Sequence, residues 1–153
     1  MVFYSNCVND TMCLGRKLGE LLKPGDIICL NGDLGTGKTH FVKGLAKGLE
    51  IVDTITSPTF AIVNEYNGRL KFYHFDVYRV NDPDEIEAIG FDEYIFSEAV
   101  SVIEWSDYID ELIPKEHIDV RIEKDNLKDY NCRIIKINYC GSRYDYIKEL
   151  SKI

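Results

Sequence analysis

The sequence predicts an α/β fold: a single-domain three-layer sandwich over residues 1–153, with a mixed parallel and antiparallel sheet. Three observations favour this fold class. A short apolar run at residues 26–31 leads into a glycine-rich loop and then an amphipathic segment. Two β-rich runs flank a hairpin signal at Asn67–Gly68. The 153 residues, 45% of them hydrophobic and 29% charged, suffice for one core.

The N-terminal part is predicted to run helix, strand, loop, helix. Apolar residues recur at helical spacing between residues 9 and 22, with a capping residue among 9–11 and a stop at Pro24–Gly25. Residues 26–31 (DIICLN) form a buried strand, and residues 39–50 form the second helix.

The rest of the chain is predicted to supply most of the sheet. Asn67–Gly68 predicts a two-residue hairpin turn. The acidic start of residues 81–95 suits the first turn of one capped helix. The further segments are strands at 59–66, 70–78, 99–105, 116–124 and 131–139, and a final amphipathic helix near 144–150.

Composition excludes several classes of protein. The net charge of −8 (18 Lys and Arg against 26 Asp and Glu) disfavours a protein that grips nucleic acid alone, so any action on RNA would pass through a partner. Five cysteines without a CxxC pair predict reduced thiols and no zinc site. No apolar run approaches the ~18 residues of a membrane span, and the N-terminus lacks a basic leader, so we expect no membrane association and a cytoplasmic location.

The pattern Gly32-x-x-x-x-Gly37-Lys38-Thr39 fits a phosphate-binding loop (P-loop) set between a strand and a helix. Glycines let backbone N–H groups turn toward one centre, and the helix N-terminus attracts an anion. Lys38 would reach the β- and γ-phosphates, and the Thr39 hydroxyl would ligate Mg²⁺. The loop therefore predicts nucleotide binding by a P-loop NTPase-like fold.

Asp76 and Glu104 are the candidate acids on the metal side of such a site. Each could be a solvated carboxylate at a strand end. Because each ends an apolar run, where an unpaired charge is costly, a role in holding Mg²⁺ or polarising water is favoured. Trp105 follows Glu104 directly and is expected near this site, the alternative being an ordinary core or interface aromatic.

The stretch TITSPTF, residues 54–60, allows two interpretations. It could carry a hydroxyl toward the γ-phosphate and reorganise on hydrolysis, or it could be a Ser-Pro turn leading into a strand. The sequence lacks the Asn-Lys-x-Asp motif of guanine-specific proteins, and this absence favours ATP over GTP. It also lacks the Arg-bearing lid that is typical of small-molecule kinases.

Several segments together resemble the TsaE (YjeE) family, the small P-loop ATPases of bacterial tRNA threonylcarbamoyladenosine (t⁶A) synthesis. They occur in the family's order across nearly the whole chain, and the HFDxYR segment followed by IEW is the specific part. The segments are GDLGTGKT (32–39), TSPTF (56–60), YHFDVYR (73–79), DEIEAIGFDEYI (84–95) and IEW (103–105).

The resemblance implies ATP and Mg²⁺ as cofactors. It implies Lys38, Asp76 and Glu104 as catalytic residues, Asp76 being the Walker-B-like acid, and a metal held by Thr39, Glu104 and Asp76. The implied nucleotide-binding residues are Thr11, Leu34, Gly35, Thr36, Gly37, Lys38, Thr39 and Arg133.

The resemblance also implies that the chain docks on a complex of TsaD and TsaB, which modifies adenosine 37 of tRNA, so that tRNA is met only through these partners. Two other functions stay open. One is a nucleotide-gated protein-binding module in which hydrolysis is incidental, and the other is a small-molecule kinase.

Overall fold

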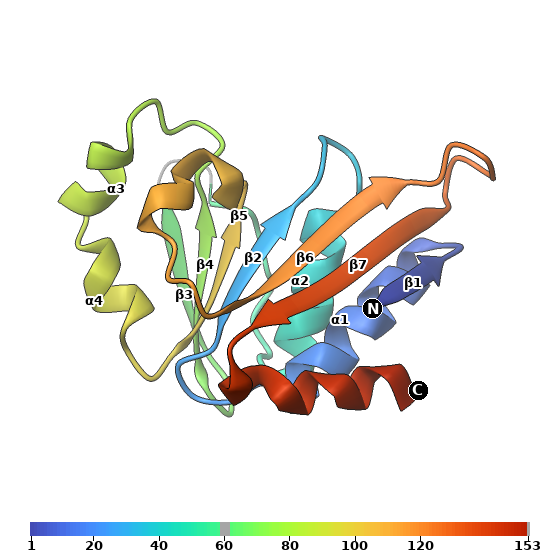
Figure 1. Ribbon diagram of the computed structural model, residues 1–153, viewed down its shortest axis with the longest axis horizontal. Coiled ribbons are helices and arrows are strands. Elements are labelled where there is room, and N and C mark those ends of the chain that lie inside the picture. The colour runs from blue at the N-terminus through green and yellow to red at the C-terminus, as the bar shows by residue number, and fades with distance from the viewer. Residues whose placement is uncertain (59–61, 153) are drawn as a thin grey trace.

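A computed structural model describes residues 1–58 and 62–152. These residues fold around one seven-stranded sheet (Figure 1). The strand order is β1-β7-β6-β2-β5-β4-β3. The four central strands, β6, β2, β5 and β4, are parallel, and the other three pair antiparallel at the two edges, which confirms the mixed sheet. The strands are β1 (Val2–Ser5), β2 (Ile27–Asn31), β3 (Val63–Asn67), β4 (Lys71–Asp76), β5 (Val100–Glu104), β6 (His117–Lys124) and β7 (Arg133–Cys140).

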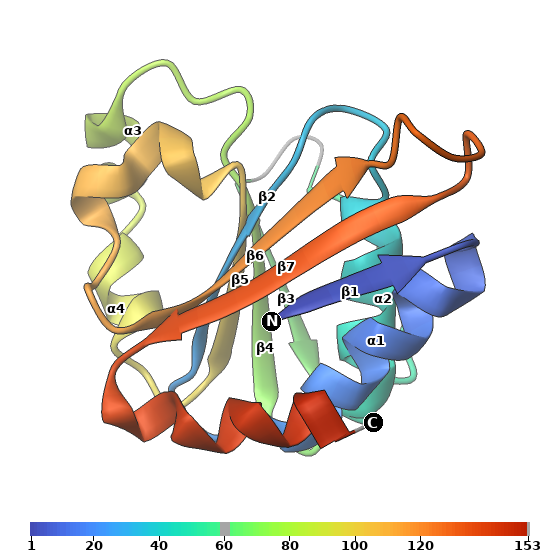
Figure 2. The same cartoon turned by 45° about the vertical axis from the view of Figure 1, so that its right-hand side comes forward.

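Helices lie on both faces of the sheet, as Figures 1 and 2 show. One face packs on α1 (Val8–Leu21), α2 (Lys38–Gly48) and the 3₁₀ helix η2 (Ser142–Lys152). The other packs on α3 (Pro83–Ala88), α4 (Phe91–Ile95) and the 3₁₀ helix η1 (Ser106–Leu112). Each face has its own hydrophobic core, so the predicted three-layer arrangement is present.

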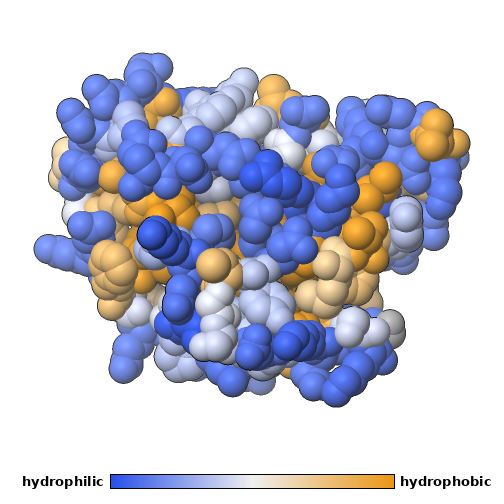
Figure 3. Space-filling model, viewed as in Figure 1, coloured by the Kyte–Doolittle hydropathy of each residue, from blue (hydrophilic) through white to orange (hydrophobic). Residues whose placement is uncertain are grey.

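Every residue of β2 and β5 is buried, as expected for central parallel strands covered on both faces. Strand β6 instead alternates: Ile118, Val120 and Ile122 are fully buried against the helices, as their spacing predicted. Asp119 and Arg121 point to the outer face. That outer face carries many hydrophilic side chains in Figure 3.

Helices α1 and α2 pack closely at a crossing where both helices carry glycines. A Cβ atom added at Gly15 would lie 2.4 Å from the Phe41 carbonyl oxygen, and one added at Gly44 would lie 2.2 Å from the Met12 carbonyl oxygen. Gly19 and Gly48 meet the opposite backbone in the same way. The backbones therefore touch, and this contact fixes where the first turn of α2 stands.

Three local predictions are wrong. The segment 81–95 forms two helices instead of one, because Gly90 adopts a left-handed φ of 80° between them. The predicted cap at the start of this segment is confirmed, since Asp82 accepts a hydrogen bond from the Asp84 N–H. The hairpin loop has three residues, 68–70, because the turn docks on the end of α2, where the Arg69 N–H donates to the Leu49 carbonyl. Helix α1 begins one residue before the expected caps, after Cys7.

Some elements were not predicted, and one prediction is only partly described. Strand β1 and helix η1 carry no clear periodicity and were missed. The strand predicted for residues 59–66 begins at Val63, and residues 59–61 lie outside the described part of the chain. The final helix is present but is 3₁₀ in type.

The cysteines are all free, as expected. Cys29 is buried on β2, and this burial raises the pKa of its thiol to about 12. Within the described residues, no helix is long and apolar enough to cross a membrane.

Candidate nucleotide and metal site

Strand pairing brings the predicted site residues to one edge of the sheet. Strands β2, β5 and β4 are parallel neighbours, so their carboxyl ends lie together, at the top of Figure 1. Glu104 is the register partner of Leu30 on one side and of Asp76 on the other. The two strand-end acids therefore flank each other directly beside the loop that follows β2.

The glycine loop has the backbone that its sequence predicted. Gly37 caps α2 with a left-handed φ of 104°, a conformation that most residues avoid. Gly32 packs so closely on β6 that an added Cβ would lie 2.4 Å from the Ile122 carbonyl oxygen. The Thr36 hydroxyl donates to the Asp33 carbonyl across the loop. These contacts hold the loop at the N-terminus of α2, where an anion is favoured.

The side chain of Lys38 lies inside this loop. Its Nζ donates to the carbonyls of Gly32 at 2.6 Å and Asp33 at 3.0 Å, and it sits 4.0 Å from the centre of the Trp105 ring. Burial lowers the pKa of Lys38, and the nearby charges of Glu104, Asp76 and Asp33 oppose that shift. Trp105 was expected beside the site, and its contact with Lys38 confirms this.

A cavity of about 320 Å³ collects the candidate phosphate and metal residues. The hydroxyls of Thr39 and Ser57 meet there with their oxygens 3.3 Å apart. Ser57 was not singled out as a site residue, and its place favours the first interpretation of TITSPTF, in which the loop carries a hydroxyl into the site. The cavity is lined by Leu34, Gly35, Gly37, Lys38, Thr39, His40, Ser57, Asp76, Glu104 and Trp105.

The two acids differ in environment. The pKa of Asp76 is raised above its usual range, mainly by burial, although the hydrogen bond that it accepts from the Tyr78 N–H acts in the opposite direction. Glu104 is 2% exposed and hydrogen-bonded by His74 from the neighbouring strand, with 2.7 Å between Nε2 and Oε2. His74 was missed, although its position two residues before Asp76 in a strand indicates the same face of the sheet.

The donor set suits Mg²⁺ bound together with a nucleotide. Within the described residues, no group of three or more His, Cys, Asp or Glu side chains could hold a metal alone. Mg²⁺ commonly takes one or two carboxylates and completes its shell with phosphate oxygens and water. One hydroxyl and two carboxylates at this cavity fit that requirement: Thr39, Glu104 and Asp76.

Thr11 and Arg133 meet the outer side of the loop. They line a smaller cavity of about 110 Å³ together with Gly35, Thr36 and Gly37. The Arg133 guanidinium donates to the carbonyls of Thr36 at 2.8 Å and Gly35 at 3.3 Å. Two residues far apart in the sequence are thus brought to the predicted nucleotide loop.

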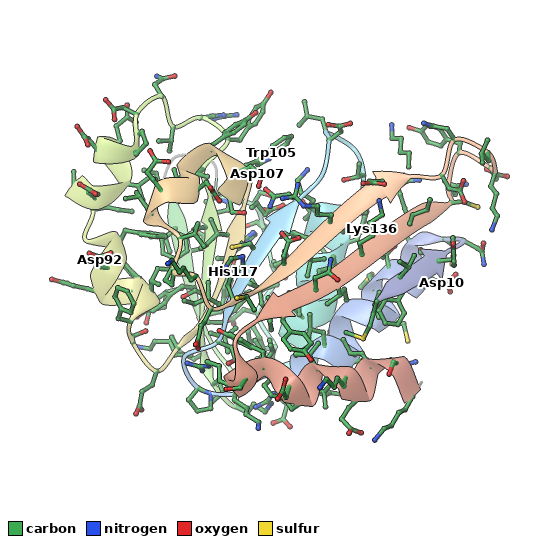
Figure 4. All side chains as sticks on the ribbon, viewed as in Figure 1. Asp10, Asp92, Trp105, Asp107, His117 and Lys136 are labelled. Carbon is green, nitrogen blue, oxygen red and sulfur yellow. The ribbon has the colours of Figure 1, made fainter. Side chains whose placement is uncertain are left out.

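A wider hollow of about 700 Å³ lies on the other side of Trp105, over the end of β6. Arg121 makes a two-pronged ion pair with Asp107 there, at 2.9 and 3.0 Å. Figure 4 labels Trp105 and Asp107 close together at this edge of the sheet. The hollow borders the loop through Gly32 and Asp33, but its lining mixes acidic and basic side chains.

The chain matches known proteins over most of its length. The family model described as "Threonylcarbamoyl adenosine biosynthesis protein TsaE" matches residues 5–134. The "tRNA threonylcarbamoyladenosine biosynthesis protein TsaE" of Bacillus subtilis (strain 168) is 41% identical over 145 residues, covering 94% of this chain and 89% of that protein. The protein of the same name from Treponema pallidum is 41% identical over 118 residues, covering 77% and 87%.

A solved structure gives the same result. The crystal structure of YdiB from Bacillus subtilis superposes with a TM-score of 0.82 at 35% identity, covering 99% of this chain and 94% of that one. Matches of this extent confirm both the resemblance and the P-loop NTPase-like fold. The chain belongs to the TsaE family.

Proposed function

We propose that this chain binds ATP with Mg²⁺ and hydrolyses it as a subunit required for t⁶A formation at position 37 of tRNA, acting on a TsaD–TsaB complex. The observation that carries the proposal is the 320 Å³ cavity, where Lys38, Thr39, Asp76 and Glu104 converge at the mouth of the P-loop. Membership of the TsaE family and the names of the relatives support the pathway.

Lys38 would bind the β- and γ-phosphate oxygens. Its ammonium now donates to two loop carbonyls, so nucleotide binding exchanges these contacts for charged phosphate oxygens. The loop N–H groups and the N-terminus of α2 would stabilise the same charge. When bound, Mg²⁺ neutralises charge on the β- and γ-phosphates, and Thr39 and Glu104 would hold it, with Asp76 beside them.

Asp76 would orient the attacking water. Its carboxylate lines the cavity at the end of β4, and its hydrogen bond from the Tyr78 N–H fixes the direction in which it points. Because burial raises its pKa, this carboxylate is a better proton acceptor than an exposed aspartate.

Hydrolysis by the chain alone should be slow. No arginine lines the 320 Å³ cavity in the described part of the chain, and Arg133 donates to the outer side of the loop. An arginine supplied to the γ-phosphate can be worth several powers of ten in rate. A partner protein would complete the site, and the net charge of −8 suits contact with protein partners that hold the tRNA.

The test compares Asp76→Ala with Asp92→Ala, an exposed aspartate on α4 that lies away from the site (Figure 4). Asp76→Ala should retain ATP binding by calorimetry but lose phosphate release in the presence of TsaD and TsaB, while Asp92→Ala should retain both. Unchanged phosphate release from Asp76→Ala would refute the catalytic assignment.

A nucleotide-gated binding module is the second candidate. The observation that favours it is the contact between the Ser57 and Thr39 hydroxyls, since it ties loop 54–58 to the residue that would hold the metal. Nucleotide binding could then change the loop and so the affinity for partners. A non-hydrolysable ATP analogue distinguishes the two: if it supports repeated rounds of tRNA modification, the binding module is correct and hydrolysis is incidental.

A further inference from the structure

His74 and Glu104 form a buried pair beneath the candidate metal site. The ring Nε2 lies 2.7 Å from Glu104 Oε2, and the side chains are 0% and 3% exposed. The geometry follows from strand pairing. His74 stands two residues before Asp76 on β4, and Asp76 is the register partner of Glu104 on β5, so all three side chains lie on the face that packs against α2.

The imidazole is not explained by packing alone. Among the described residues, its buried Nδ1 atom has no hydrogen-bond partner, which costs free energy that an apolar side chain in this place would not cost. The ring also stacks on Phe72, with centroids 6.3 Å apart, an environment suited to leucine or phenylalanine. What the imidazole contributes, and an apolar side chain cannot, is the hydrogen bond to Glu104.

The direction of that hydrogen bond follows from its partners. A carboxylate that binds a cation is ionised and only accepts, so with the cation bound the ring would donate from Nε2 to Glu104 Oε2. The bond fixes one oxygen of the carboxylate and therefore its plane, while lone pairs remain on the carboxylate for a cation. Carboxylates that bind metals are usually oriented by such partners, whose loss typically costs 10- to 100-fold in metal affinity.

We propose that His74 is a positioning residue that orients the Glu104 carboxylate toward the divalent cation. This inference rests on the proposed function, because it takes Glu104 as a metal ligand. It assigns to the first residue of the HFD segment a role distinct from that of Asp76, which reaches the cavity directly. His74 lines no part of that cavity and acts only through Glu104.

The test measures metal affinity instead of activity. Mn²⁺ replaces Mg²⁺, and its binding to the protein with a non-hydrolysable ATP analogue is followed by electron paramagnetic resonance. His74→Leu should weaken Mn²⁺ binding by about 10- to 100-fold, whereas the affinity for the analogue in EDTA should stay within about twofold. His74→Gln, whose terminal amide can take the place of Nε2, should recover Mn²⁺ affinity to within about threefold of the wild type.

Two further variants keep the result decisive. Val100→Ala removes two methyl groups from a fully buried side chain on the same face of β5, so it should lower thermal stability without weakening Mn²⁺ binding. If His74→Leu does not fold, His74→Asn replaces it: the shorter amide matches Nδ1 instead of Nε2, so it should lose the Mn²⁺ affinity that His74→Gln keeps.

The outcomes separate this inference from the proposed function. Wild-type protein that binds the analogue but never Mn²⁺ would overturn the metal site, and the role of His74 with it. Wild-type Mn²⁺ affinity in His74→Leu, or an equal loss in Val100→Ala, would overturn only the positioning role.

Discussion

The crossing of α1 and α2 gives a prediction whose sign separates two physical effects. Gly44 lies inside α2 and is buried against α1. Helix propensity alone predicts that Gly44→Ala stabilises the protein by about 1 kcal/mol, because alanine favours helix over glycine by that amount. Close backbone packing predicts the opposite result.

The structure gives the size of the opposing effect. The new Cβ would lie 2.2 Å from the Met12 carbonyl oxygen and 3.0 Å from the Arg16 nitrogen. Since ordinary contact begins near 3.4 Å, the helices must separate by roughly 1 Å at this point. Overpacking of this kind costs about 1–3 kcal/mol and sometimes more, and here the obstacle is backbone that cannot turn away. Because the obstacle is backbone, we take the upper value of about 3 kcal/mol, and after the helix-propensity gain of about 1 kcal/mol the net loss is about 2 kcal/mol, or about 4–8 °C in Tm for a domain of this size.

The same displacement should reach the site, because α2 begins at Lys38 and continues with Thr39. A misplacement of about 1 Å can cost on the order of 100-fold in a catalytic step, so ATP affinity and turnover should fall together with Tm. Thermal denaturation and calorimetry check this, with Lys47→Ala, an exposed change on the same helix, as the control expected within about 0.5 kcal/mol of wild type. A Tm for Gly44→Ala equal to or above that of the wild type would refute the argument.

Three further predictions concern the site. ATP with Mg²⁺ should change the fluorescence of Trp105, the single tryptophan, because nucleotide draws Lys38 away from its ring, and Lys38→Ala should show no such response. Asp76→Asn should raise Tm at neutral pH without nucleotide or metal. Burial raises the pKa of Asp76, so above that pKa the charged carboxylate destabilises the folded wild-type protein. The stability gained by Asp76→Asn should therefore shrink as pH falls toward and below 3.8, the ordinary pKa of aspartate. A Tm below that of the wild type at neutral pH would contradict this prediction. Arg133→Ala should weaken ATP binding about tenfold in calorimetry because two charged hydrogen bonds to the loop are lost, whereas Lys136→Ala, an outward-facing lysine paired with Glu123, should bind as wild type.

Much of the fold was predictable because its signals are local. The alternation of Ile118, Val120 and Ile122 identified β6, and the apolar run before the glycines identified β2. The errors arose where a tertiary contact outweighed a local preference. The turn after Asn67 took three residues because Arg69 binds the end of α2, and β1 exists because it pairs with β7, at the other end of the chain.

The candidate site also has a part that local sequence predicts and a part that depends on tertiary contacts. Gly32 to Thr39 could be interpreted from sequence alone, since a P-loop depends on backbone torsions and on spacing within eight residues. Asp76 and Glu104 could be picked as candidates because each ends an apolar strand, but nothing local says that their strands are neighbours. The crossing of α1 and α2 could not be predicted either. From sequence alone, a glycine inside a helix indicates only a less stable helix, and its role in close packing is visible only when the second backbone lies against it.

The sequence by itself determined that this chain carries the P-loop pattern, that two acids end its buried strands, and which family its motifs resemble. Only the tertiary structure decided that His74 holds Glu104, that Ser57 meets Thr39, and that Thr11 and Arg133 share a cavity at the loop. The physical reason is range. Torsional preference and periodicity act over a few neighbouring residues, whereas these contacts depend on strand order, register and helix crossing, which the packing of the whole chain sets.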